Sequence, residues 1–356
     1  MIKTAVIGAA GYTGIELVRY LLGHPAFELK CATTNSNAGQ LIADVYPTFI
    51  GQTDLVFTDH DIEKVKAECS VVFLAVPHTA AMALVPELLA AGITVIDLSA
   101  DFRLKDPLVY EQWYGIAHSA PDLLEQAIYG LPEMSRAALL RAASEQAEKG
   151  KPALVACPGC YPTATALALL PALQAGFVKP GSTVVVNAIS GVSGAGRSPS
   201  TKNLFCTANE NINAYAVASH RHTPEIEQTI SQLAACAMPI SFTPHLAPLQ
   251  RGLLSTVSVE LMSGIDSEVL YDCYRQDYAT EPFTHYLGRG MPQTASVVGG
   301  NNAQVGVTHD VRTNRLIASC AIDNLGKGAA TQAIQCANII FGLDEKTGLD
   351  SIQPIL

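Results

Sequence analysis

The sequence predicts an α/β protein: a Rossmann-type, doubly wound parallel sheet domain, followed by an α+β domain with a mainly antiparallel sheet. Short apolar runs alternate with helical patterns through the first half, as in βαβ units. Residues 71–76 are apolar throughout, which is typical of a central parallel strand buried on both faces. Residues 253–261 instead alternate apolar and polar side chains, which indicates an antiparallel sheet with one solvated face.

The same periodicities place the individual elements. In the first half they predict strands at 4–8, 28–33, 71–76, 94–98 and 153–156, and helices at about 13–22 and 79–91. In the second half they predict a helix at 162–174, a Gly/Ser loop at 190–196, strands at 183–189, 253–261, 304–307 and 315–322, and a last helix at 328–341. A length of 356 residues favours two domains, and we place the change near Cys160.

Composition narrows the class of protein. A content of 49% hydrophobic and 15% charged residues is that of a folded globular chain. A net charge of −10 argues against a broad surface for nucleic acid or anionic membranes. The N-terminus lacks a signal-peptide pattern, and no run approaches the ~18 apolar residues of a membrane span. Nine cysteines, mostly isolated in apolar runs, indicate a reducing compartment, so we expect a cytoplasmic protein.

A glycine motif directly follows the first predicted strand and opens the first helix. It reads Gly8-Ala-Ala-Gly11-Tyr12-Thr13-Gly14. Glycines at this place permit a tight turn and let the backbone approach a pyrophosphate at the positive end of the helix. A merely tight β–α turn is the alternative. We interpret the motif as a dinucleotide site that includes Tyr12 and Thr13.

The end of the second strand indicates which dinucleotide is bound. An NAD site is expected to place an acid there for the ribose 2′-hydroxyl. Residues 33–37 read Thr-Thr-Asn-Ser-Asn, and the next acid is Asp44. Hydroxyl and amide groups tolerate a 2′-phosphate that a carboxylate would repel. We therefore expect NADPH/NADP as the cofactor, with Thr34 and Ser36 near it.

The block Cys157-Pro-Gly-Cys160-Tyr-Pro162-Thr carries the candidate nucleophile. Pro162 suits a first helical position, which would place Cys160 just before a helix N-terminus. The helix dipole and unused amides there lower the pKa of a thiol and favour a nucleophilic thiolate. A redox Cys157–Cys160 pair and a buried structural cysteine are the alternatives. No second CxxC or nearby histidine pair completes a metal site.

A histidine block, His220-Arg-His222-Thr223-Pro224, supplies a candidate acid/base. Thr223 and Pro224 resemble an N-cap and a first helical residue, so His222 would lie just outside a helix start. A positive helix end disfavours the imidazolium and keeps the ring available as a base near neutral pH. A surface cap is the alternative, and the sequence does not choose between His220 and His222.

Further signals indicate anion recognition. The glycine-rich loop at 190–196 could form a nest of main-chain N–H groups, and Arg197 follows it. Arg103 follows a strand end, and Arg251 precedes another strand. The alternatives are a flexible loop and ordinary surface ion pairs.

These motifs belong to eight ordered blocks along the whole chain: GAAGYTG, TTNSNAG, LSADFR, PGCYPT, SGVSGAGR, HRHTPEI, HLAPLQRG and DNLGKGAA. In these blocks the sequence resembles the N-acetyl-γ-glutamyl-phosphate reductases of arginine biosynthesis, and more widely the aspartate-semialdehyde dehydrogenases. PGCYPT and HRHTPEI fit the former better. Cys157 departs from the family pattern, in which an apolar residue or Asn stands there, and we expect no functional pairing with Cys160.

The resemblance implies a mechanism. The Cys160 thiolate attacks a small-molecule acyl phosphate and forms a thioester, which NADPH reduces to the semialdehyde. His222 or His220 would act as acid/base. The resemblance places Arg103 at the phosphate, and makes Arg197 and Arg251 further substrate-anion candidates.

The resemblance also implies cofactor contacts and an assembly. Ser193 and Gly194 fall in the loop near the nicotinamide, and Asn324 falls in the block that meets the cofactor amide. The NADP-binding domain would comprise 1–159 and 327–356, the last helix returning to it. The catalytic, substrate and oligomerisation domain would comprise 160–326, and a homodimer or homotetramer would form.

Three other functions remain open at this level. A related acyl-phosphate reductase, from lysine synthesis or acting on aspartyl phosphate, would share the chemistry. A non-catalytic NADP-binding sensor would not need a thiol at a helix N-terminus. A cysteine hydrolase would not need the glycine motif, so cofactor binding separates it from the reductases.

Overall fold

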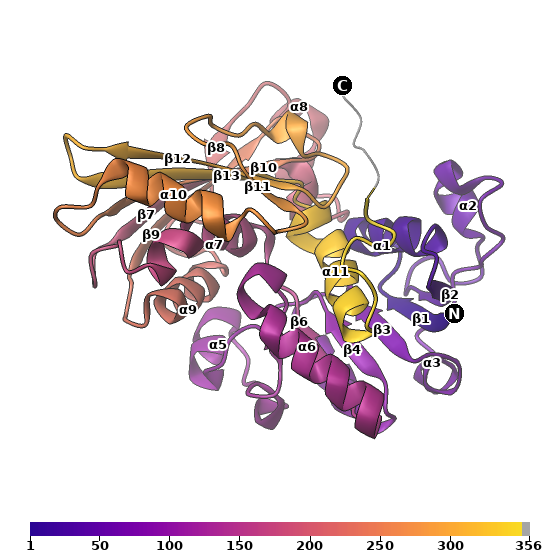
Figure 1. Cartoon of the computed structure of the whole chain (residues 1–356). Helices are drawn as coiled ribbons and strands as arrows, with labels where there is room; N and C mark the ends of the chain where they lie inside the picture. The colour runs from indigo at the N-terminus through magenta and orange to yellow at the C-terminus, as the bar shows by residue number, and fades with distance from the viewer. Residues whose placement is uncertain (351–356) are drawn as a thin grey trace. The chain divides into compact units, whose positions relative to one another are not determined.

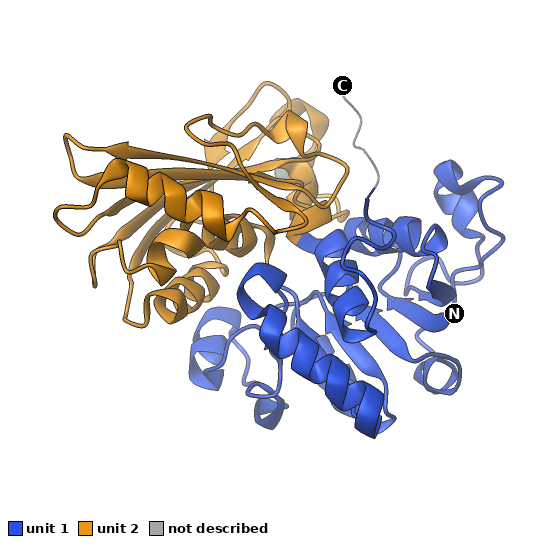
Figure 2. Ribbon diagram, in the orientation of Figure 1, with its two compact units in different colours: residues 1–158, 329–351 blue, residues 159–328, 352–356 orange. Residues whose placement is uncertain are grey.

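The computed structural model describes residues 1–350. These residues form two compact units (Figure 2). Among the described residues, the first unit comprises Met1–Pro158 and residues 329–350. The second comprises Gly159–Gly328. The predicted first domain also includes residues 351–356, which lie outside the described residues.

The first unit is built on a six-stranded sheet in the order β2-β1-β3-β4-β6-β5, with every pair parallel (Figure 1). Its strands are β1 (Ile2–Ile7), β2 (Phe27–Thr33), β3 (Val71–Leu74), β4 (Thr94–Asp97), β5 (Ile128–Tyr129) and β6 (Leu154–Ala156). Its helices are α1 (Tyr12–Leu22), α2 (Ile42–Val45), α3 (Ile62–Glu68), α4 (Ala81–Ala90), α5 (Pro107–Tyr114), α6 (Pro132–Lys149) and α11 (Thr331–Ile340). The predicted doubly wound parallel sheet is confirmed.

The strand order of this sheet predicts where a ligand would bind. The chain runs from β1 outward to β2 and then crosses to β3 on the other side of β1. Ligands of open parallel sheets bind at the carboxyl ends of the strands where the order reverses in this way. Helix α11 comes from the far end of the chain and packs against α6, β4 and α1, as Figure 1 shows.

The second unit contains a seven-stranded sheet in the order β11-β12-β13-β10-β7-β9-β8. Its strands are β7 (Val184–Gly191), β8 (Asn213–Ala214), β9 (Ile240–Ala247), β10 (Leu253–Glu260), β11 (Thr284–Tyr286), β12 (Ala303–Asp310) and β13 (Arg315–Ile322). Its helices are α7 (Cys160–Gln174), α8 (Phe205–Ala208), α9 (Thr223–Ala234) and α10 (Ser267–Asp277). Only β7–β9 and β11–β12 are parallel among its pairs in the described chain, so the predicted mainly antiparallel sheet is confirmed.

Helix α7 forms the core of the second unit. It packs on β10, β12 and β13, and its side chains from Tyr161 to Leu173 are buried. A helix that is apolar on all sides is expected to be enclosed in this way. Strand β10 shows the predicted alternation, because Val257 and Val259 are buried while Thr256 and Ser258 are partly exposed.

The sequence analysis missed several elements and misplaced the boundaries of others. Helices α5, α6 and α10 and strand β9 were not predicted. In α6 only Pro132 and Leu139 are buried, so its apolar periodicity is faint. The last helix was predicted at 328–341, but its first part is a π-helix, Gly326–Ala330, and α11 begins at Thr331.

A buried histidine connects two parts of the first unit. His24 Nδ1 accepts the main-chain N–H groups of Ala26 at 3.2 Å and Phe27 at 3.0 Å. Its Nε2 lies 3.1 Å from Asn338 Oδ1 and 2.9 Å from the carbonyl oxygen of Thr347. A ring that accepts at Nδ1 and donates at Nε2 is neutral. Burial lowers the pKa of His24 below its usual value.

This lowered pKa predicts a loss of stability in mild acid. The unfolded chain takes up the proton first as pH falls below about 6.5, so the free energy of unfolding decreases from there downward. We expect the melting temperature of the wild type to fall by at least about 2 °C between pH 7.5 and 5.5. His24→Gln should melt lower at pH 7.5 and show a smaller pH dependence. Equal pH dependence in the two proteins would contradict this role.

Candidate active site

The glycine loop after β1 is shaped by close backbone approaches. Gly8 has a φ of +88°, and a Cβ there would lie 2.4 Å from the carbonyl oxygen of Ala75. A Cβ on Gly14 would lie 2.2 Å from the carbonyl oxygen of Gly8. Gly11 is the N-cap of α1, and a Cβ there would meet nothing nearer than 3.6 Å. The loop thus packs through Gly8 and Gly14 and leaves room at Gly11.

The neighbouring candidates lie in the first turn of α1 and directly after β2. Tyr12 and Thr13 form the first turn of α1, whose first N–H groups have no partner within the helix. Thr34 and Ser36 follow β2, the strand next to β1. The main-chain N–H of Ser36 donates to Thr34 Oγ1 at 3.3 Å, which folds this segment into a tight turn. These groups suit phosphate oxygens, which main-chain N–H and hydroxyl groups bind.

Two glycine substitutions should separate packing from cofactor binding. Gly14→Ala forces a Cβ into the Gly8 carbonyl, so we expect a clear drop in melting temperature. Gly11→Ala has room in the protein, so the melting temperature should stay unchanged. Its added methyl group would oppose close approach of a pyrophosphate and weaken NADPH binding by about tenfold, roughly 1.4 kcal/mol. Calorimetric titration with NADPH checks this, and unchanged affinity in Gly11→Ala would exclude the cofactor from this helix end.

The candidate nucleophile opens the central helix of the second unit. Gly159, with extended backbone angles, is the N-cap of α7, and Cys160 is its first residue. The prediction that Pro162 begins the helix and Cys160 precedes it was therefore wrong by two residues. Proline is tolerated at the third position because the first turn's N–H groups make no intrahelical bonds. Cys160 is partly exposed and lies at the positive end of the helix.

Glycine at position 159 brings the second histidine next to the nucleophile's main chain. A Cβ on Gly159 would lie 2.4 Å from His222 Nε2, so the imidazole occupies the space that a side chain would need. His222 is itself the N-cap of α9, and Thr223 is the first helical residue. The prediction of Thr223 as N-cap was wrong by one residue. Neither helix has a side-chain cap bond at its N-cap.

The first histidine belongs to a chain of hydrogen bonds. His220 Nδ1 accepts the main-chain N–H of His222 at 3.1 Å, which leaves the proton on Nε2. Nε2 lies 3.4 Å from the hydroxyl of Tyr215, which donates to the hydroxyl of Tyr161 at 3.1 Å. Tyr161 donates in turn to the carbonyl oxygen of His245 at 3.3 Å. Burial, with a contribution from Arg221, lowers the pKa of His220 to about 4, so this ring is neutral at physiological pH.

The sequence analysis missed Glu225. This buried carboxylate lies in the first turn of α9, and its Oε1 accepts the main-chain N–H of Gly159 at 2.9 Å. It thereby connects the start of α9, which carries His222, to the start of α7, which carries Cys160. The signal was present, because Glu at the third helical position is typical of a capping box. A capping box, however, would have predicted that the Glu225 carboxylate accepts a hydrogen bond from the N-cap of its own helix and not from Gly159.

Glu225 should therefore position the two helix starts. We expect Glu225→Ala to reduce turnover by about 100-fold, since misplacement of reacting groups by about 1 Å costs that much. Glu225→Gln keeps an oxygen that can accept from Gly159 and should retain most of the activity. Steady-state rates with melting curves distinguish this loss from unfolding. Full activity in Glu225→Ala would show that the bond to Gly159 is dispensable.

The structure brings Ser193, Gly194 and Asn324 together. Asn324 Nδ2 donates to Ser193 Oγ at 2.9 Å, and a Cβ on Gly194 would lie 3.7 Å from the same nitrogen. The loop prediction at 190–196 needs correction, because Gly191 still belongs to β7 and Val192–Ala195 forms a 3-10 turn. Hydrogen bonds from Val192 and Ser193 to the residues before β10 shape this turn. Arg197 is exposed in the segment that follows.

The two remaining arginine candidates are both engaged with protein groups. Arg251 forms an ion pair with Asp323, at 2.8 Å between Nη2 and Oδ2. In the first unit, buried Arg103 donates from Nε to the carbonyl oxygen of Cys157 at 2.7 Å and from Nη2 to that of Leu98 at 2.8 Å. Arg103 thus fixes the main chain shortly before Cys160.

All nine cysteines lie within the described residues, and none forms a disulfide. Cys157 is fully buried, and its Sγ lies 3.3 Å from the place where a Cβ of Gly130 would be. Residues 1–350 contain no group of three or more His, Cys, Asp or Glu arranged to hold a metal ion. Within the same residues, every helix is too short or too polar to cross a membrane.

Comparisons with known families divide the chain in two. Residues 3–142 match the family "Semialdehyde dehydrogenase, NAD binding domain", and residues 160–324 match "Semialdehyde dehydrogenase, dimerisation domain". Among solved structures, aspartate semialdehyde dehydrogenase II from Vibrio cholerae aligns with a TM-score of 0.71 over 96% of this chain and 98% of its own, at 18% identity. The enzyme from Candida albicans, solved with NADP, aligns with a TM-score of 0.71 over 98% and 99%, at 17% identity.

The fold and the two matches thus define a semialdehyde dehydrogenase type of protein. Curated relatives narrow this class. The N-acetyl-gamma-glutamyl-phosphate reductase of Heliobacterium modesticaldum is 46% identical over 99% of both chains, and that of Symbiobacterium thermophilum is 48% identical over 99% of both. The chain belongs to the N-acetyl-gamma-glutamyl-phosphate reductase family, which confirms the resemblance found in the sequence blocks.

Proposed function

We propose that the chain reduces N-acetyl-γ-glutamyl phosphate with NADPH to N-acetylglutamate 5-semialdehyde and phosphate, in arginine biosynthesis. The observation that carries the proposal is the position of His222 against Gly159, the residue directly before Cys160. The thiol begins a buried helix, and the imidazole lies on the glycine directly before it. Full-length relatives named for this activity support the choice of substrate.

The residues of the second unit account for the covalent steps. Cys160 Sγ, deprotonated by His222, attacks the acyl carbon; a carbon–sulfur bond forms and the bond to phosphate breaks. The reduced nicotinamide supplies the hydride for the resulting thioester. His222 then gives a proton to the tetrahedral oxyanion and takes it back as the carbon–sulfur bond breaks, which releases the aldehyde and restores the thiolate.

We assign the acid/base role to His222 and a positioning role to His220. A general base must exchange its proton with the reacting group. His220 holds the N–H of His222 on one nitrogen and lies beside Tyr215 on the other, and its pKa of about 4 keeps it neutral. His222 has its Nε2 against Gly159, next to the nucleophile in the chain.

We assign the cofactor site to the first unit. The glycine loop and the start of α1 fit a pyrophosphate, because Gly8 and Gly14 allow the tight turn and Gly11 leaves the helix end open. Thr34 and Ser36 fit a 2′-phosphate, which favours NADP over NAD. Ser193, Gly194 and Asn324 are assigned to the nicotinamide by the family resemblance.

The remaining assignments concern the substrate and the assembly. We assign Arg103 to the substrate phosphate and Arg197 to a substrate anion. Arg251, the third candidate, is paired with the Asp323 carboxylate. We further propose a homodimer or homotetramer formed by the second unit, and a cytoplasmic location. Light scattering of the purified protein tests the assembly.

The reverse reaction tests the proposed function. N-acetylglutamate semialdehyde, phosphate and NADP⁺ are mixed with the protein, and NADPH is followed by its absorbance. Formation that requires phosphate supports the phosphorylating thioester route. Aspartate semialdehyde is the matched control substrate, and faster turnover of it would reassign the enzyme. Replacing NADP⁺ with NAD⁺ tests the cofactor choice.

A further inference from the structure

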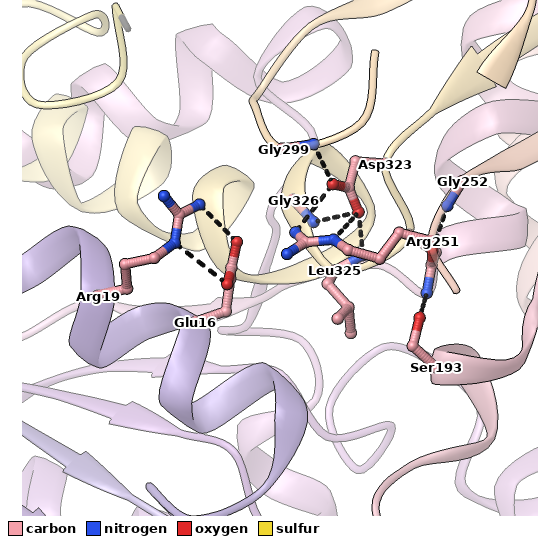
Figure 3. Close-up of polar contacts among 10 residues, drawn as sticks. Glu16, Arg19, Ser193, Arg251, Gly252, Gly299, Asp323, Leu325 and Gly326 are labelled. Atoms are coloured by element: carbon pink, nitrogen blue, oxygen red, sulfur yellow. Dashed lines mark hydrogen bonds and ion pairs between the residues drawn. The ribbon is translucent and has the colours of Figure 1, made fainter. Parts of the chain in front are cut away.

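A buried carboxylate organises the segment around Asn324. Asp323 follows β13 and is fully buried. Its Oδ1 accepts the main-chain N–H groups of Leu325 at 2.9 Å and Gly326 at 3.2 Å. Its Oδ2 accepts the N–H of Gly299 at 2.5 Å and pairs with Arg251 Nη2 at 2.8 Å (Figure 3). Asp323 therefore holds three separate segments of the second unit at one point.

Two of these segments carry groups of the proposed site. Asn324 accepts the main-chain N–H of Gly252 at 2.8 Å, directly after Arg251, and donates to Ser193 Oγ at 2.9 Å. The orientation of the Asn324 amide is thus fixed at both ends. Gly252 belongs to the segment that the Asp323–Arg251 pair joins to Asn324, and Ser193 is tied to that segment by its main-chain N–H, which donates to the carbonyl oxygen of Gln250 at 3.2 Å.

The segment that follows Asp323 also contacts the proposed nucleophile. The main-chain carbonyl oxygen of Asp323 accepts the N–H of Gly328 at 2.9 Å, a bond that spans five residues and opens the π-helix. A Cβ on Gly328 would lie 2.8 Å from Cys160 Cβ. The backbone at Gly328 therefore lies directly against the nucleophile. Isolated π-turns in proteins are frequently functional, since they cost stability relative to an α-helix.

From these contacts we infer that Asp323 is a positioning residue of the reaction: its carboxylate, paired with Arg251, sets Gly328 against Cys160 and Asn324 against Ser193. The ion pair is unusual for a surface arginine, because the side chain of Arg251 is 24% exposed whereas that of Asp323 is 0% exposed. A buried carboxylate needs such a counter-charge and several donors. The role deepens the proposed function and rests on it for the turnover measurement only.

Asp323→Asn tests the inference. The amide oxygen can replace only one carboxylate oxygen, so the NH₂ group must face either the N–H of Gly299 or those of Leu325 and Gly326. We expect turnover to fall by about 100-fold while the KM values for the acyl phosphate and NADPH change by less than about threefold. Unchanged turnover would overturn the inference.

A second readout does not depend on the substrate. The rate at which iodoacetamide alkylates Cys160 is measured between pH 6 and 10, with the labelled peptide identified by mass spectrometry. We expect the midpoint of this profile to shift in Asp323→Asn, because Gly328 no longer holds the nucleophile in one place. An unchanged midpoint alongside a lower melting temperature would show a purely structural role. This measurement stands even if the proposed substrate is wrong.

Asp266→Asn is the matched control. Asp266 caps α10, where it accepts the N–H groups of Glu268 and Val269, and α10 packs on the far half of α7 through Tyr274 and Ala168. Asparagine caps helices as well as aspartate does. Turnover and the alkylation profile should therefore match the wild type. A loss equal to that of Asp323→Asn would mean that replacing any capping carboxylate of this unit by an amide has the same effect, and would overturn the inference.

Substitutions of Arg251, the partner of Asp323, test the inference even if Asp323→Asn does not fold. Arg251→Lys retains a cation that can reach Asp323, and Arg251→Met does not. We expect turnover in the order wild type, Arg251→Lys, Arg251→Met, with little change in KM. A raised KM for the acyl phosphate at unchanged turnover would place Arg251 on the substrate and overturn the positioning role.

Discussion

Cys160→Ser is expected to lower turnover by at least about 10³-fold, because a neutral hydroxyl is a far weaker nucleophile than a thiolate. The substitution is nearly isosteric at the first residue of α7, where serine is well tolerated. The variant should therefore keep its melting temperature and bind NADPH normally. Turnover in the reverse assay, with NADPH titration as the control for folding, measures the effect.

Formation of the thioester can also be measured directly in the wild type. With acyl phosphate and no NADPH, it should release about one equivalent of phosphate per subunit and carry the acyl group on the Cys160 peptide. Cys160→Ser should show neither. Cys206→Ser is the matched thiol control, since Cys206 is exposed and lies outside the assigned site. Persistent turnover in Cys160→Ser would refute the thioester mechanism.

The second large effect is expected at His222. His222→Asn removes the proposed acid/base, and loss of a general acid/base typically costs about 10²–10⁴-fold. The pH dependence of the remaining turnover should also lose the limb that reports the imidazole. His220→Asn provides the comparison, because it removes a ring that is neutral and hydrogen-bonded.

His220→Asn should lower the melting temperature and reduce turnover less than His222→Asn does. The pH profile of His220→Asn should keep both limbs, since a group with a pKa of about 4 does not titrate in the working range. If His220→Asn instead lost a limb and His222→Asn kept both, the two assignments would be exchanged.

Local sequence patterns predicted most of the fold and identified the candidate active-site residues. The apolar run at β3 indicates burial, and the glycine loop before α1 indicates a tight turn. Each pattern occupies only a few residues, so both features can be predicted from the sequence. Weakly patterned elements such as α6, in which only Pro132 and Leu139 are buried, were not predicted. Helix starts were misplaced by one or two residues, because Gly159 and His222 serve as N-caps without a side-chain bond.

The sequence by itself determined the α/β class through its periodicities along the chain. It also identified the glycine loop, the candidate nucleophile and the two candidate histidines, since each is encoded in a short segment. Only the tertiary structure brought His222 against Gly159, which is distant in the chain, and placed His220 Nε2 near the hydroxyl of Tyr215. It also supplied the contacts from which we infer positioning roles for Glu225 and Asp323. A buried carboxylate takes its function from the groups that folding brings to it. Gly159, which donates to Glu225, and Gly299 and Arg251, which contact Asp323, lie tens of residues away in the chain.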